Sequence, residues 1–264
     1  MRRIGPAAAL VIALANAQTA APDKSALRFE VATIRPSHSS DGPSGIRPAP
    51  GGERYTASHV TLKLFLSVAY RVRTEQVIGG PQWVASDAYD MNAKAERPSS
   101  LEELHVMLQN LLADQFKLQL RREPKEMSIY ALVVDKDGPK LKPHEARDAG
   151  EPWIDVAFSP FPHATWHAQF APMDYFAWRL SNILDRPVVD QTNLKGGYDF
   201  DLSFAADLPP ALQRPGALLN GEPIDTSGPP IFDAIRKQLG LRLDREKGPA
   251  DTLVIEHAEK PAEN

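Results

Sequence analysis

Residues 187–202, PVVDQTNLKGGYDFDL, place a short apolar run, a polar turn and an alternating run next to one another. From Tyr198 to Leu202, apolar side chains occur at every second position, and Asp199 and Asp201 fall between them. A period of two is typical of a β-strand with one buried and one solvated face. The segment therefore predicts a β-hairpin in which both aspartates face water.

The turn between the two arms carries residues that suit a chain reversal. Asp190 can fold its carboxylate onto nearby backbone N–H groups, and Gly196 and Gly197 permit positive φ. Asp190 is thus predicted to be an Asx-type cap rather than a general base. Asp190, Gly197, Tyr198 and Asp199 together form a structural signature without an evident nucleophile, metal cluster or phosphate loop.

The predicted elements occur twice in the same order. Residues 27–141 and 162–264 each predict a strand, a helix, two strands, a helix and two strands. The tetrapeptide YDMN at 89–92 corresponds to YDFD at 198–201. The chain is therefore predicted to be α+β, built by internal duplication of a two-layer unit with both helices on one face of the sheet.

Caps mark the ends of the predicted helices. Thr61 is expected to cap the first helix, and Ser100 with Glu103 forms a capping box for the second. Gly240 is expected to end the fourth helix, because glycine adopts the left-handed conformation found after many helices.

The remaining segments complete the predicted organisation. The last two strands of each copy are expected to form a hairpin, within residues 117–135 and within 241–257. Residues 142–161 are predicted to be a Pro-interrupted linker, and residues 205–230 a Pro-rich insertion in the second copy.

Residues 1–17 have the features of a secretory signal peptide. Arg2 and Arg3 precede an apolar run, and Ala15 and Ala17 form a small-x-small cleavage site. The run is much shorter than the roughly 20 residues that span a bilayer. We therefore expect a periplasmic or secreted protein without a stable membrane span after cleavage.

Composition excludes several classes of protein. The 264 residues are 42% hydrophobic and 24% charged, which suits a soluble globular protein of one or two domains. A net charge of −4 argues against a nucleic-acid partner. The absence of Cys excludes disulfides, thiol nucleophiles and thiolate metal sites.

Eight ordered blocks from Phe29 to the C-terminus carry a resemblance to a known family. The blocks are FEVATIRPS, VTLKLFLSVAY, QVIGGPQWV, YDMNAKAE, LLADQFKLQLRRE, YALVVDKDGPKL, RPVVDQTNLKGGYDFDL and LVIEHAEKPAEN. They resemble the soil-associated exported family of unknown function that is expanded in Acidobacteria. Asn193 departs from the family's usual Thr-Gly-Leu turn, and tolerates the same left-handed backbone.

The resemblance implies export and no agreed activity. Similar domains are fused to membrane metallopeptidases of the antibiotic-sensor type, which implies a periplasmic sensing role. The order of elements also resembles the short N-terminal domains of secretins and TonB-dependent receptors. The HExxH motif of the peptidases does not occur in this sequence.

The histidines do not predict a metal site. His163 and His167 are four residues apart, a spacing that would pair two ligands on a helix. In the predicted strand the same spacing separates them by about 13 Å. His105 and His257 lie on amphipathic elements and are expected at the surface or its boundary. No metal and no cofactor are predicted.

The aspartates of the signature leave an enzymatic alternative open. Asp199 and Asp201 share a strand face and could hold a cation or act as an acid–base pair. Asp90 and Asn92 occupy these positions in the first copy, as expected for a solvated face. A hydrolase would need Asp190, Asp199 or Asp201 to converge on a concave pocket with shifted pKa values.

The favoured function is a non-enzymatic exported module for binding or sensing. Its exposed strands, or the cleft between its copies, would receive a peptide, a cell-wall fragment or an envelope protein. Trp83, Trp153 and Trp166 lie beside turns or the linker and are the candidate aromatic contacts, although they could equally belong to the core. The competing functions are the hydrolase and a structural envelope protein assembled through strand edges.

Overall fold

The structure is a computed structural model. It describes residues 24–38, 44–48, 52–145, 153–158, 162–208, 212, 218–219, 222–224 and 227–261. The predicted signal peptide at 1–17 lies outside the described residues, as does much of the predicted insertion at 205–230. Among the described residues, no helix combines the length and the apolar character needed to cross a bilayer.

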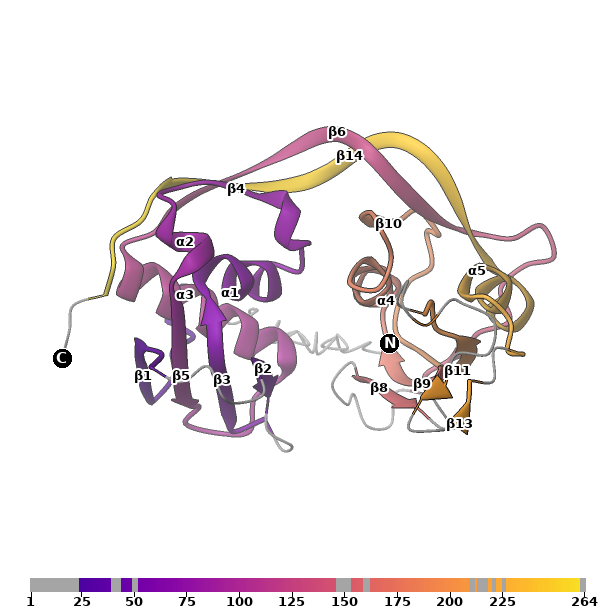
Figure 1. Cartoon of the computed structure of the whole chain (residues 1–264), viewed down its shortest axis with the longest axis horizontal. Coiled ribbons are helices and arrows are strands. Elements are labelled where there is room, and N and C mark those ends of the chain that lie inside the picture. The colour runs from indigo at the N-terminus through magenta and orange to yellow at the C-terminus, as the bar shows by residue number, and fades with distance from the viewer. Residues whose placement is uncertain are drawn as a thin grey trace, which may run out of the picture.

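The first lobe is an antiparallel sheet packed against helices (Figure 1). Its strands, in the spatial order β1-β5-β3-β2, are β1 (Val31–Pro36), β5 (Ala88–Lys94), β3 (Arg54–Thr61) and β2 (Gly45–Pro48). Its helices are α1 (Leu62–Ala69), α2 (Trp83–Ser86) and α3 (Leu101–Phe116), with 3-10 turns η1 (Lys24–Ala26) and η2 (Thr74–Gln76). Apolar residues of α1, α3, β3 and β5 form one buried core.

The second lobe repeats this layout. Its sheet has the order β7-β11-β9-β8, with β7 (Lys142–Pro143), β11 (Tyr198–Ala205), β9 (His163–Ala171) and β8 (Trp153–Phe158). Its helices are α4 (Met173–Ser181) and α5 (Ile231–Ala234), which continues as the π-helical turn η4 (Ile235–Leu239). A separate pair of short strands comprises β12 (Leu218–Leu219) and β13 (Glu222–Pro223).

Two long strands join the lobes. We call β6 (Gln119–Val134) and β14 (Leu241–His257) the ribbon, and Figure 1 shows it arching across both lobes. The two strands pair antiparallel along their whole length. In the first lobe β4 (Val77–Gly79) adds to β14 in parallel, and in the second lobe β10 (Val188–Asp190) adds to β6 in parallel. Each ribbon strand therefore contributes to both lobes.

The ribbon corrects the prediction of hairpins within 117–135 and 241–257. Each segment is one continuous strand, and Pro124 lies opposite Asp251 while Pro249 lies opposite Glu126. The middle of the ribbon spans from one lobe to the other, so much of it is exposed. Exposed polar residues and prolines are also typical of turns, which is why the sequence pattern suggested a chain reversal at this point.

The segment 187–202 is also not a hairpin. Its first arm, β10, pairs with β6 of the ribbon, whereas its second arm, β11, pairs antiparallel with β9. β4 and β5 of the first lobe are divided between two sheets in the same way. The turn around 191–197 thus transfers the chain from the ribbon sheet to the sheet of the second lobe.

The predicted linker at 142–161 contains regular structure, which corrects that expectation. β7 pairs with β11, and β8 forms the edge of the second sheet beside β9. In β8, Ile154 is buried and Trp153 is exposed, as alternation in an edge strand requires.

The α+β class is confirmed by this arrangement. Apart from the short α2 in the first half and the short strands β12 and β13 in the second, the order β3-α1-β4-β5-α3-β6 matches β9-α4-β10-β11-α5-β14. The ribbon strand of each half reaches across to complete the other lobe. The duplication itself stays a prediction, and the observed order is the feature that supports it.

Candidate functional site

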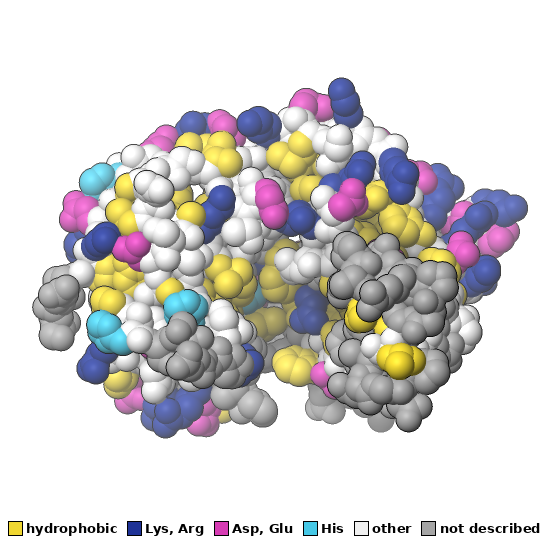
Figure 2. All heavy atoms as spheres, viewed as in Figure 1, with side chains coloured by type: hydrophobic (Ala, Val, Ile, Leu, Met, Phe, Trp, Pro, Cys, Tyr) yellow, Lys and Arg dark blue, Asp and Glu magenta, His cyan; other side chains and the backbone are white. Residues whose placement is uncertain are grey.

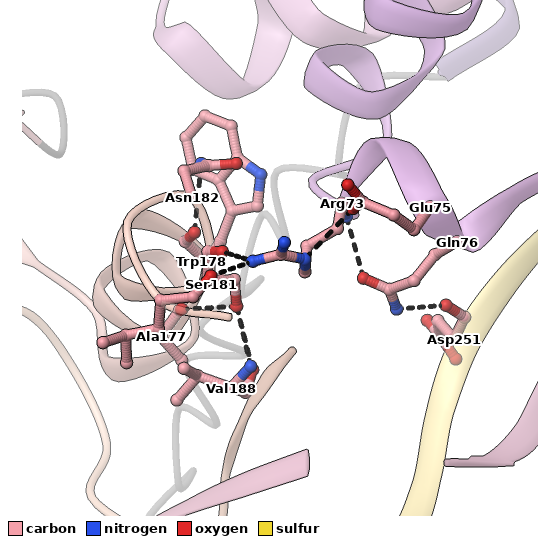
Figure 3. A network of polar contacts seen from close by, with 10 residues as sticks. Arg73, Glu75, Gln76, Ala177, Trp178, Ser181, Asn182, Val188 and Asp251 are labelled. Carbon is pink, nitrogen blue, oxygen red and sulfur yellow. Dashed lines mark hydrogen bonds and ion pairs between the residues drawn. The ribbon is translucent and has the colours of Figure 1, made fainter. Parts of the chain in front are cut away.

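The two lobes meet around α4, and an arginine from the first lobe reaches its C-terminal end. The Arg73 guanidinium donates through Nη1 to the carbonyl oxygen of Ser181 (Figure 3). The same Nη1 also donates to the carbonyl oxygen of Leu184. The last carbonyls of a helix have no intrahelical partner and carry partial negative charge. Arg73 therefore neutralises and caps the end of α4, and its own side chain is only 17% exposed.

Further hydrogen bonds extend this contact to the ribbon (Figure 3). The side-chain oxygen of Gln76 accepts from the backbone N–H of Arg73 at 2.8 Å, and its Nε2 donates to the carbonyl oxygen of Asp251 in β14. On the far side of α4, the backbone N–H of Val188 donates to Ser181 Oγ at 2.8 Å. The first lobe, α4, β10 and the ribbon are thus linked by one polar network.

Beside this network lies a buried aromatic cluster. His105 of α3 stacks on Tyr55 and meets the edge of Trp178 of α4, in both cases with ring centres 6.2 Å apart. Tyr175 packs against Trp178 with ring centres 5.7 Å apart. Within the described residues, neither His105 Nδ1 nor Trp178 Nε1 has a hydrogen-bond partner.

His105 is buried, which corrects its expected place at the surface. Only 4% of the residue is exposed. Burial, with a smaller contribution from Arg71, lowers the pKa of His105 to about 3, so the ring is neutral at physiological pH. The amphipathic pattern of α3 could not reveal this environment, because the second lobe covers this part of the helix.

Two pockets lie on either side of α4 and share Trp178. The polar pocket, about 400 Å³, is lined by Tyr70–Val72, Arg122, α4, β10 and Pro249–Asp251 of β14. Its walls carry the ion pair between Arg122 and Asp251, with N and O atoms 3.0 Å apart, and a longer contact of 4.0 Å between Arg71 and Asp174.

The apolar pocket, about 570 Å³, is formed by α1 of the first lobe and by β8, β9, α4 and β11 of the second. Its walls include Val68, Trp166, Trp178, Ile183 and Phe204. Figure 2 shows hydrophobic side chains in the hollow between the lobes and charged side chains along the ribbon. Both pockets take residues from both lobes, so each depends on how the lobes are placed.

Asp199 does not simply face water. Its carboxylate accepts from the backbone N–H of Phe170 at 2.8 Å, and His144 Nδ1 lies 2.8 Å from the same oxygen. Burial raises the pKa of Asp199, but the Phe170 hydrogen bond and His144 outweigh it and hold that pKa below its ordinary value. Gly197 packs here too, because a Cβ at this position would lie 2.4 Å from Phe170 Cδ2.

The other two aspartates lie elsewhere. Asp190 accepts from the backbone N–H of Thr192 at 2.9 Å, which is the predicted Asx-type cap. Asp201 lies on the outer face of β11, with its Oδ1 2.6 Å from His167 Nδ1 and its side chain 74% exposed. Of the three, only Asp190 lines one of the two pockets beside α4. Within the described residues these carboxylates do not converge.

The three predicted tryptophans occupy different environments. Trp83 is half-buried on α2 and stacks on Phe116, while Trp153 on the edge strand β8 is 49% exposed. Trp166 is 2% exposed and belongs to the core, where it lines the apolar pocket.

A fourth tryptophan, Trp178, lines both pockets and was not predicted from the sequence. It was missed because it lies beside the apolar stripe of α4 rather than on it. The only sequence signal for the role of Trp178 was the presence of a tryptophan outside that apolar stripe.

The histidines and acids of the described residues form no group of three or more that could hold a metal ion. His163 and His167 both lie on β9, and His167 pairs with Asp201.

Comparison with known proteins gives a family without an assigned activity. No curated protein and no solved structure matches the chain. The family model described as a protein of unknown function (DUF3738) matches residues 63–258, from α1 to the end of the ribbon. The match leaves out β1, β2 and β3 of the first lobe, but it includes α4, the ribbon and every residue that lines the two pockets. The chain belongs to the DUF3738 family of proteins of unknown function.

Proposed function

We propose that the protein is a non-catalytic binding or sensing module whose ligand enters between the two lobes. One observation carries this proposal: the polar and the apolar pocket both take walls from both lobes and meet at Trp178. Ligand sites in proteins occur preferentially at such interfaces between domains. A ligand that touches both lobes can also report its presence through their relative position.

The construction of the lobe contact suits a sensor. Arg73 and Gln76 hold the first lobe to α4 and to the ribbon by hydrogen bonds to carbonyl oxygens. A hydrogen bond contributes only about 0.5–1.5 kcal/mol net to stability, because water can replace either partner when the contact opens. A ligand that binds one arrangement of the lobes more tightly than another would shift the population towards that arrangement.

The cellular setting is part of the proposal. Residues 1–17 are typical of a signal peptide, which supports a periplasmic or secreted module. The resemblance to exported soil-associated proteins, and to domains fused to antibiotic-sensor metallopeptidases, supports sensing of an envelope component. The net charge of −4 favours a peptide, a cell-wall fragment or an envelope protein over a nucleic acid as the partner.

The hydrolase alternative has less geometric support. Asp190 is engaged in its turn and Asp199 holds the backbone of Phe170. Asp201 lies exposed beside His167. Each aspartate thus has a local structural partner, whereas catalysis would need a carboxylate directed at a pocket together with a second reacting group.

A titration of the mature protein tests the proposal. Residues 18–264 would be mixed with peptides, glycan fragments and ester substrates while tryptophan fluorescence and product formation are followed. We expect saturable binding without product, and loss of the fluorescence signal in Trp178→Phe. Trp153→Phe is the matched control, because Trp153 is exposed on the edge strand β8 and lines neither pocket. Turnover that disappears when Asp190, Asp199 or Asp201 is changed would favour the hydrolase instead.

A further inference from the structure

The apolar pocket contains a cationic side chain whose charge no described residue neutralises. Arg179 in the last turn of α4 lines the pocket, and its guanidinium carbon lies 5.7 Å from the centre of the Trp166 ring. Exposed Asp207 also lines the pocket, yet no ion pair joins it to Arg179 in the described part of the chain. The guanidinium is therefore available to an external anion.

The same pocket has apolar surface that the protein itself leaves uncovered. Ile183 lines it and is 48% exposed, so the pocket wall has aliphatic surface open to solvent. Trp166 and Trp178 add aromatic surface to the same wall. The pocket thus offers a ligand an apolar surface and the Arg179 cation.

We propose that the apolar pocket binds a small molecule with an aliphatic chain that ends in a carboxylate. The inference deepens the proposed binding function and rests on it. The carboxylate would accept hydrogen bonds from the Arg179 fork, and the chain would cover Ile183 and the Trp178 ring. The volume of about 570 Å³ lies within the common range of roughly 300–1,000 Å³ for small-molecule sites.

Three ligands of equal chain length separate the contributions of charge and of chain. Decanoate is the anionic probe, decanamide the neutral one and decyltrimethylammonium the cationic one, each titrated into mature protein by calorimetry and tryptophan fluorescence. We expect decanoate to bind at least about tenfold more tightly than decanamide, as hydrogen bonds to a charged group predict. Lengthening the chain by one methylene should tighten binding about fourfold while the pocket still has room.

Variants locate the cation. Arg179→Gln should reduce decanoate affinity to about that of decanamide and leave decanamide unchanged, while Arg179→Lys should retain part of the preference. Arg245→Gln is the matched control, because Arg245 lies 5.9 Å from the Tyr130 ring in a similar cation–π geometry and does not line the pocket. Thermal unfolding of every variant is the control that tests whether the fold is kept.

Several outcomes would overturn the inference. The inference is wrong if decanamide or decyltrimethylammonium binds as tightly as decanoate. It is also wrong if Arg179→Gln leaves decanoate affinity unchanged. In either case the proposed site between the lobes would bind another class of ligand. A preference for the cationic probe that Asp207→Asn abolishes would assign the charge to Asp207. If none of the three probes binds, the inference also fails, and the peptide and glycan titrations decide the proposed function separately.

Discussion

The carboxylate of Asp199 fixes the backbone of Phe170 by a hydrogen bond of 2.8 Å. Phe170 has a left-handed φ of 49°, beside a register shift between β9 and β11. Asp90 accepts from the backbone N–H of His59 at the same distance in the first lobe, where His59 has a φ of 51° beside a shift between β3 and β5. Both strained residues stand two positions before a helix N-cap.

The two Tyr-Asp pairs therefore have a structural explanation. A left-handed φ is costly for a residue with a side chain, and a β-bulge needs a partner for the N–H that it removes from the ladder. In each lobe an aspartate on the neighbouring strand of the sheet accepts the hydrogen bond from this N–H. The recurrence of this motif is a further feature that supports the predicted duplication.

The first prediction compares two neighbouring aspartates. Asp199→Ala should lower the free energy of unfolding by about 1–2 kcal/mol, because it leaves the Phe170 N–H and the strained backbone without a partner. Asp201→Ala is the matched control on the same strand and should be close to neutral, since its side chain is 74% exposed. Urea denaturation measures both, and equal effects would contradict the assigned role of Asp199.

The pH dependence of the same site follows from the lowered pKa of Asp199. A carboxyl whose folded pKa is depressed stabilises the protein above its unfolded pKa of about 3.9, and this contribution is lost as pH falls through the folded pKa. The difference in free energy of unfolding between wild type and Asp199→Asn should therefore have its full value at pH 6 and become smaller below about pH 4. A stability difference that grows as the pH falls would contradict the lowered pKa of Asp199.

The second prediction concerns His105. Its folded pKa of about 3 lies below the ordinary value of 6.5, so the unfolded chain takes up the proton first. The contribution of neutral His105 to the free energy of unfolding is therefore complete above about pH 6.5 and is lost progressively as the pH falls towards about 3. His105→Phe should fold, keep the aromatic packing on Trp178, and lose less stability than wild type between pH 7 and pH 4.5. Parallel denaturation curves for the two proteins across that range would show that His105 does not titrate this way.

The third prediction addresses the contact between the lobes. Arg73→Met should keep the aliphatic packing but remove the donors to Ser181 and Leu184, so the C-terminal turn of α4 should exchange its amide hydrogens faster. Arg54→Met, at an exposed position in β3, is the control and should leave α4 unchanged. Unchanged exchange in the Arg73 variant would mean that other contacts hold the lobes together.

Local signals in the sequence predicted local structure. Thr61 accepts from the Leu64 N–H, and Ser100 and Glu103 form the expected capping box. Gly240 ends its helix with a left-handed φ of 64°. The period of two from Tyr198 onward also placed the buried face of β11 correctly. Each of these features depends on residues that are close along the chain.

Strand partners and the interface were beyond the same reasoning. Alternation indicates which face of a strand is buried, but it does not say which strand lies beside it, so β10 and β11 were paired with each other instead of with β6 and β9. Trp178 and Arg73 gain their roles from residues more than 70 positions away. A single sequence contains no local pattern that records such a contact.

The last prediction tests the ribbon, the feature that differs most from the sequence interpretation. Ser128 and Lys247 lie opposite one another and both are exposed, yet the two hairpins predicted from sequence would place them in separate turns. Because the chain has no Cys, Ser128→Cys with Lys247→Cys introduces one defined pair, and directly opposed strand residues are within disulfide reach. Mild oxidation should cross-link the folded monomer and speed its migration on non-reducing gels. Ser128→Cys with Lys63→Cys, which places the second thiol on α1, should stay reduced; equal cross-linking of both pairs, or of neither, would contradict a continuous ribbon.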